Sequence, residues 1–171
     1  MTDYQPSRIG RGLAILVVAA LVLMWLYVFT GAAAEDPPDQ LDDTTFAEAA
    51  EPRCALAVDE LEELPAAGEA ESAADRAAVL DEANAVLASM VDDLAAIEVD
   101  NERDQALVDL WIADWRTYLQ DRQDFADRLR ADDEAELLIT AREGRQITLT
   151  IDRFASKVVN DMESCTTPLD A

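Results

Sequence analysis

Arg122 is the residue of this sequence whose surroundings best suggest binding chemistry. In a helix, where each residue turns by about 100°, it falls between Tyr118 and Phe125 and close to the direction of Trp115. A guanidinium on an apolar face must pair with a carboxylate or reach water. One interpretation is a structural ion pair with an acid on a neighbouring helix. The other is a ligand pocket in which the arginine receives an anionic group, with aromatic walls made by Trp111, Trp115 and Tyr118.

The two cysteines of the chain, Cys54 and Cys165, are expected to form a disulfide. Four helices joined by short loops alternate in direction, which brings the start of the first beside the end of the fourth. A bridge there forms in an oxidising compartment and stabilises by up to about 4 kcal/mol in the chain-entropy model. Two free buried thiols, or a bridge between two molecules, are the alternatives. Two cysteines alone make a poor zinc site, so no metal ligands are assigned.

The residue types also argue against an enzyme. The chain contains no His, which excludes Ser-His-Asp, Cys-His and His-containing zinc sites, and it has no phosphate-binding glycine loop. With 37 acidic residues, carboxylate pairs arise at any spacing by chance. The acidic runs at 36–43 and 132–134 lack the alternation of a calcium-binding EF-hand loop. The sequence therefore predicts a protein that is not an enzyme and needs no cofactor.

Charge is distributed unevenly along the chain. The formal net charge is −24, and the first 30 residues contain Arg8 and Arg11 but only Asp3. The remainder is therefore strongly acidic. Such a surface repels nucleic acids and anionic lipid headgroups, so no nucleic-acid partner is expected, whereas cations and basic proteins are favoured.

Residues 12–34 form an uncharged segment, and 13–29 are apolar throughout. About 20 helical residues cross a hydrocarbon core of about 30 Å, so this segment is predicted to be a transmembrane anchor. Arg8 and Arg11 precede it, and the positive-inside rule places residues 1–11 in the cytoplasm. The acidic part then lies outside the cell membrane.

A cleavable signal peptide is the competing interpretation of the same segment. Ala32, Ala33 and Ala34 before Glu35 form the small-residue pattern that signal peptidase accepts, and cleavage would make the protein secreted. Signal peptides usually have a shorter apolar region of about 7 to 15 residues. An aromatic belt at the end of the segment, made by Trp25, Tyr27 and Phe29, also favours a retained anchor. Both interpretations place the domain outside the cytoplasm.

The exported part is predicted to be all α-helical. An acidic linker at 35–50 is followed by a bundle at 51–166 and a tail at 167–171. Its helices are expected at 51–64, at 72–97 with Ser72 as cap, at 101–130 with Asn101 as cap, and from 133 to about 165 with a bend near Gly144. The last begins its clear pattern at Ile147 and places Cys165 on the buried face.

These inferences combine into one fold and two functions. The fold is an up-and-down four-helix bundle, closed by a disulfide and anchored by one N-terminal transmembrane helix. The first function is a non-enzymatic interaction or accessory domain that uses the membrane and an unidentified protein as its partners. The second is an extracytoplasmic domain that senses a small molecule or a cation. A pocket lined by Arg122 and the two tryptophans favours the second, and a filled core with Arg122 paired to an acid favours the first.

Overall fold

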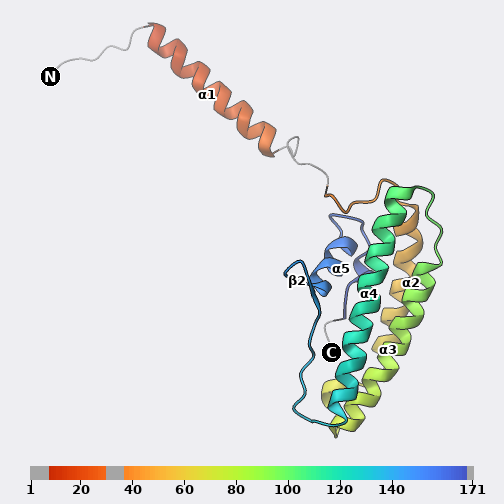
Figure 1. Ribbon diagram of the computed structural model, residues 1–171. Helices are drawn as coiled ribbons and strands as arrows, with labels where there is room; N and C mark the ends of the chain where they lie inside the picture. The colour runs from red at the N-terminus through yellow and green to blue at the C-terminus, as the bar shows by residue number, and fades with distance from the viewer. Residues whose placement is uncertain (1–7, 30–36, 169–171) are drawn as a thin grey trace, which may run out of the picture. The chain divides into compact units, whose positions relative to one another are not determined.

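The computed structural model describes residues 8–29 and 37–168 of the chain. The chain divides into two units, residues 1–37 and 38–171. The first unit contains α1 (Arg8–Phe29), and the second, here called the bundle domain, contains the other helices and two short strands (Figure 1). Across the described residues, no helix has both the length and the hydrophobicity needed to cross a membrane. The structure therefore does not support the transmembrane span predicted for 12–34, of which 30–34 lie outside the described residues.

Three long helices build the bundle domain, which confirms the predicted helical bundle. They are α2 (Thr45–Glu62), α3 (Ala73–Ala95) and α4 (Glu102–Leu129), with a short 3-10 helix, η1 (Ala67–Glu69), between α2 and α3. The two caps predicted from the sequence are present. The Ser72 side chain accepts the backbone N–H of the third residue of α3, and the Asn101 side chain does the same at α4. Both helices therefore begin where their caps satisfy free N–H groups.

The prediction of a fourth long helix that starts at residue 133 is wrong. Residues 133–140 are not helical, and they lead into a two-stranded hairpin of β1 (Ala141–Arg142) and β2 (Arg145–Gln146). Helical structure resumes in α5 (Ile147–Ala155), followed by the 3-10 helix η2 (Glu163–Cys165). Residues 148–150 lie in α5, as the predicted helical pattern from Ile147 requires. The bundle is thus completed by a short helix rather than a long one.

The segment before the hairpin is extended because it packs along α4 with a period of two. Ala135, Leu137 and Ile139 are half-buried, and the residues between them are exposed. The chain follows α4 in the opposite direction (Figure 1): Arg128 donates to the Glu136 carbonyl at 2.9 Å, and further along Arg142 pairs with Asp114. Six extended residues and fourteen helical residues both span about 20 Å, so the two runs match in length.

The turn of the hairpin explains Gly144, which was predicted to bend a helix. Glu143 and Gly144 have φ of 53° and 79°, as in the type I′ turn that joins two-residue hairpins. Beyond the hairpin, α5 ends at Ala155. Its apolar period breaks there, because Val158 is 81% exposed and Val159 is buried instead. The turn after α5 is closed by a hydrogen bond of 2.8 Å from the Met162 N–H to the Ala155 carbonyl.

Part of the predicted linker packs against the bundle domain; we call residues 38–43 the docked segment. The Asn160 side-chain amide accepts the Leu41 N–H at 2.8 Å and donates to the Asp39 carbonyl at 3.1 Å. The same amide group donates to the Phe154 carbonyl near the end of α5 at 3.0 Å. Leu41 is buried in the core. One asparagine therefore joins the docked segment to α5.

Asp104 holds the other end of the docked segment. Its carboxylate, 1% exposed, accepts the backbone N–H groups of Asp42 and Asp43 at 3.0 Å and the Asn101 side chain at 2.7 Å. Burial works to raise the pKa of Asp104, but these hydrogen bonds outweigh it and hold the pKa below its ordinary value. The carboxylate thus stays charged and stabilises the segment that enters α2.

Docking also moves the start of the first helix of the domain. α2 begins at Thr45, six residues before the predicted start, so residues 45–50 of the predicted linker are helical. The Asp43 side chain accepts the Thr45 N–H at 2.7 Å, and Phe46 is buried against Trp111 with ring centroids 6.1 Å apart. Pro52 consequently lies inside the helix rather than in its first turn. Capping and burial outweigh the proline signal here.

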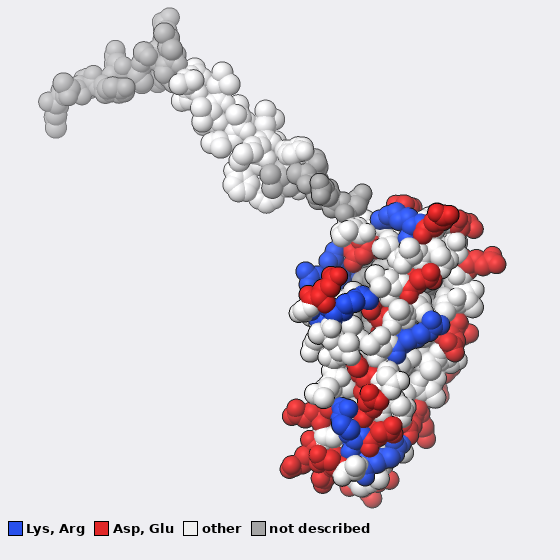
Figure 2. Space-filling view, viewed as in Figure 1, with Lys and Arg blue, Asp and Glu red and all other residues white. Residues whose placement is uncertain are grey.

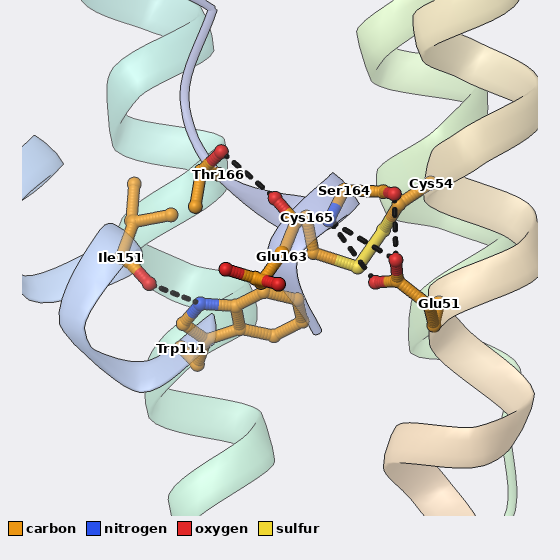
Figure 3. The surroundings of a disulfide bond; sticks show 8 residues. All are labelled: Glu51, Cys54, Trp111, Ile151, Glu163, Ser164, Cys165 and Thr166. Carbon is orange, nitrogen blue, oxygen red and sulfur yellow. Dashed lines mark hydrogen bonds between the residues drawn. A yellow bond between two sulfur atoms is a disulfide. The ribbon is translucent and has the colours of Figure 1, made fainter. Parts of the chain in front are cut away.

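The predicted disulfide between Cys54 and Cys165 is confirmed, and it joins residues with a sequence separation of 111. Both cysteines are fully buried, and the bridge joins α2 to η2 (Figure 3). Beside it, the Glu51 carboxylate accepts the Ser164 backbone N–H at 3.1 Å and its hydroxyl at 2.6 Å. Trp111 donates to the Ile151 carbonyl at 3.2 Å on the α5 side. The C-terminal segment is thereby fixed to the start of the bundle.

Asp104→Asn provides a test of the docked segment. We expect it to lower the free energy of unfolding by about 1–3 kcal/mol at neutral pH, because a charged acceptor of backbone N–H groups is lost. A depressed carboxyl pKa gives stability that is present above the ordinary value of 3.8 and disappears as pH falls through the lower folded value. The difference between wild type and variant, measured by urea unfolding, should therefore shrink below that pH.

Asp109→Asn serves as the matched control, since Asp109 is an exposed acid on the same helix. We expect it to change the free energy by less than about 0.5 kcal/mol. A difference between wild type and Asp104→Asn that stays constant down to strongly acidic pH would contradict the role given to the Asp104 carboxylate.

Candidate functional site

A polar layer divides the interior of the bundle domain into two apolar clusters. The large core contains the disulfide and reaches Leu87 on α3 and Tyr118 on α4. The small core begins at Leu80 on α3 and Phe125 on α4. Asn84 and Arg122 lie between the two clusters in sequence on the same two helices, and both are buried. The layer therefore crosses the interface of α3 and α4.

Arg122 makes its described contacts with neutral groups. Its side chain is 1% exposed, and its Nε donates to the Asn84 Oδ1 at 2.7 Å. One terminal nitrogen donates to the Tyr118 hydroxyl at 3.2 Å, and the guanidinium carbon lies 5.6 Å from the centroid of the Tyr118 ring. Asn84 and Tyr118 orient the guanidinium, but neither brings a negative charge.

The ion pair expected as one interpretation of Arg122 is not present among the described residues. No carboxylate of residues 37–168 forms a salt bridge with it. A guanidinium stays protonated and has five N–H donors, of which two are accounted for. The Nδ2 of Asn84 is a second buried donor without a partner in the described part of the chain. Burying an ion without a counter-charge costs several kcal/mol.

A cavity of about 710 Å³ adjoins this layer, with Arg122 on its wall. It lies between the second half of α2, the central part of α3 (residues 79–90) and the C-terminal segment 163–168. Its apolar lining includes Leu61, Pro65, Val79, Leu80, Leu87 and Met90. The volume lies within the range of about 300–1,000 Å³ usual for small-molecule sites. We call this space the α2–α3 cavity.

The aromatic walls predicted for an Arg122 pocket do not belong to the α2–α3 cavity. Among the described residues that line it, Trp111, Trp115 and Tyr118 do not appear. Trp111 is stacked on Phe154 with centroids 5.1 Å apart, and Trp115 lies edge-on to Trp111 inside the large core. Aliphatic residues of α2 and α3 form the wall instead, because Trp111 packs against α5 and Trp115 packs against Trp111.

Asn84 was missed by the sequence reasoning, although a signal for it existed. It follows Leu80 by four residues and precedes Leu87 by three, so it lies on the same apolar stripe of α3. An amide on such a stripe indicates a polar partner on the facing helix, and that partner is Arg122. The cavity had no comparable signal, because it depends on the path of the chain after α4.

The other buried acid, Asp114, has a structural explanation. Burial raises its pKa, and the charge and hydrogen bond of Arg142 oppose that rise. The pair fixes β1 to α4, and Asp114 does not line the α2–α3 cavity. Over residues 8–29 and 37–168, no cluster of three His, Cys, Asp or Glu side chains is placed to hold a metal ion.

No protein-family model matches the chain, and no curated protein or solved structure shows significant similarity to it. The case for a function therefore comes from the geometry of the polar layer and the cavity beside it.

The polar layer can be tested by removing it. We expect the double variant Asn84→Leu, Arg122→Met to keep or raise the free energy of unfolding of ligand-free protein, by up to about 2 kcal/mol. Replacing a buried charged group by well-packed apolar residues is often neutral or stabilising. The free energy of unfolding is measured by urea unfolding of protein from which bound ligands have been removed. Near-ultraviolet circular dichroism monitors the unfolding.

Arg116→Met is the matched control, because Arg116 is an exposed arginine on the same helix. It should stay within about 0.5 kcal/mol of the wild type. Breaking a buried charge pair costs about 3 kcal/mol or more. If the double variant loses this much free energy of unfolding, the role of the polar layer is to stabilise the fold.

Proposed function

We propose that this protein is a non-enzymatic, membrane-anchored extracytoplasmic domain that binds a small anionic molecule in the α2–α3 cavity. One observation carries the proposal: Arg122 is a buried guanidinium on a cavity wall, with neutral groups as its described partners. An anion in the cavity would supply the missing counter-charge and accept the remaining N–H donors. The binding role is therefore preferred to the interaction role that the sequence put first.

A purely structural polar layer is the competing explanation. Buried polar residues can fix the register of packed helices, and Asn84 with Tyr118 partly satisfies the arginine. Register alone, however, does not require a cavity next to the charge. A neutral pair would also fix the register at a lower cost. The combination of cavity and uncompensated charge therefore favours a ligand.

The compartment is supported by the disulfide. The bridge between Cys54 and Cys165 suits an oxidising environment outside the cytoplasm. The anchor has a different basis, namely the uncharged sequence of 12–34 and the two arginines before it. A retained anchor and a cleaved signal peptide both deliver the domain to that compartment.

A role in binding a partner protein stays a prediction alongside ligand binding. Figure 2 shows Asp and Glu side chains over the visible face of the bundle domain, with fewer Lys and Arg among them. Such a surface favours a basic protein partner over an acidic one. The two roles are compatible, because most of the acidic residues of the outer surface do not line the cavity.

Native mass spectrometry can test the proposed ligand without assuming what it is. The full chain is extracted from its host membranes into amphipol and compared with Arg122→Met and Arg116→Met. We expect wild type and Arg116→Met to retain an added non-covalent mass, and an anionic compound should be recoverable by solvent extraction. Arg122→Met should lose at least nine-tenths of it, because a charged hydrogen bond contributes about 1.5–3 kcal/mol.

An equal amount of the same compound in wild type and Arg122→Met, or none in any sample, would contradict the proposal. Circular dichroism of the three proteins checks that each is folded.

Topology requires a separate experiment in intact cells. We expect an external protease to reach the bundle domain, carbonate washing to leave the chain in the membrane, and alkylation to find both cysteines oxidised. A chain that lacks residues 1–34 should remain inside with reduced cysteines. Release by carbonate with a new N-terminus at Glu35 would identify a signal peptide. A protected domain with reduced cysteines in the full chain would reject the extracytoplasmic location.

A further inference from the structure

We propose that the ligand of the α2–α3 cavity is a single-chain amphiphile with one negative charge, a long-chain carboxylate. Its carboxylate would accept hydrogen bonds from Arg122, and its hydrocarbon chain would lie between α2 and α3. This inference rests on the proposed function and names the ligand class.

The planar arrangement of the Arg122 N–H donors favours a carboxylate headgroup. The free donors are those of a planar guanidinium, held by Asn84 Oδ1 at 2.7 Å and by the Tyr118 hydroxyl at 3.2 Å. Asn84 is not among the described residues that line the cavity, so it orients the guanidinium rather than contacting the headgroup. A flat two-oxygen acceptor matches such a set of N–H groups.

The lining of the cavity selects a hydrocarbon chain. Leu61 and Pro65 lie on the α2 side, and Val79, Leu87 and Met90 lie on the α3 side. The aliphatic part of this lining binds apolar groups more readily than it binds water. A small inorganic anion would satisfy the arginine but leave this lining unused.

Acidic side chains limit the charge of the ligand to one. Glu62 at the end of α2 and Glu163 in η2 also line the cavity. Among the described residues that line the cavity, Arg122 is the one that carries a positive charge. The whole chain has a net charge of −24. Glu163 is paired with Lys157 at 3.7 Å, so a second negative charge on the ligand would face mainly the carboxylate of Glu62, which forms no ion pair within the described part of the chain. Phosphate monoesters and dicarboxylates are therefore disfavoured.

Equilibrium dialysis of the full chain in amphipol tests the inference. The ligands are radiolabelled hexanoate, octanoate, decanoate and dodecanoate, with empty amphipol as the blank. Each added pair of methylenes should tighten binding by about fifteenfold, because a buried methylene contributes roughly a factor of four. Decyl phosphate should bind at least tenfold more weakly than decanoate. Affinity that does not depend on chain length would overturn the inference.

Variants separate the headgroup site from the chain site. Arg122→Met should weaken decanoate binding by at least tenfold and leave decanol binding unchanged, whereas Arg116→Met should change neither. Val58→Glu places a charge on a partly exposed lining residue of α2, and it should weaken both ligands. Leu56→Glu is its control, since Leu56 is exposed on α2 and does not line the cavity. Equal effects of Val58→Glu and Leu56→Glu would count against the chain site.

The residues at the end of the chain are an alternative occupant, because Pro168 lines the cavity. A chain that ends at Pro168 distinguishes them from a ligand. Equal affinity for decanoate in both chains supports the inference, and binding that appears only in the shortened chain would overturn it. If mass spectrometry finds an Arg122-dependent compound but no carboxylate of any length binds, the ligand class is wrong and the proposed function stands.

Discussion

The interior of the bundle domain is organised around one charge that cannot be neutralised by losing a proton. Arg122 lies where the large core ends at Tyr118 and the small core begins at Phe125. Because a guanidinium stays charged even when buried, its neighbours must either orient it or compensate it. Asn84 and Tyr118 orient it. Compensation is left to whatever occupies the α2–α3 cavity.

Contacts between distant residues fix the rest of the domain around this layer. Asn160 and Asp104 hold the docked segment through backbone groups 119 and 62 residues away. The disulfide joins α2 to η2, and the extended return along α4 carries the chain back to that end. The return is thin compared with a helix, so α2 and α3 are not covered by a fourth long helix. The C-terminal segment 163–168 lies where a fourth long helix was predicted, and it forms one wall of the cavity.

The sequence predicted what depends on local patterns. The caps at Ser72 and Asn101 and the apolar stripes of α3 and α4 are local features, and the cysteine pair followed from helix count. The extended segment 133–140 was missed because its alternating pattern has only three apolar positions, Ala135, Leu137 and Ile139. The neighbouring residues have good helix propensity. Docking of residues 38–43 had no local signal, since an acidic, proline-containing stretch is usually a solvated linker. Arg122 was placed on the buried face from its spacing, but its neighbours across the cavity depend on the path of the chain.

Local sequence patterns and the path of the chain give different information about function. A buried arginine on an aromatic stripe suggested an aromatic pocket, yet the tryptophans belong to the large core, where Trp111 stacks on Phe154 and donates to Ile151. The guanidinium is thus shared between two environments: its aromatic neighbour Tyr118 orients it from the core side, and aliphatic residues of α2 and α3 face it across the cavity. A structural layer would gain stability by closing that space around a neutral pair. Keeping a charge beside an apolar space is costly unless a molecule that is both anionic and apolar fills it, which is why the cavity and the charge are best explained together.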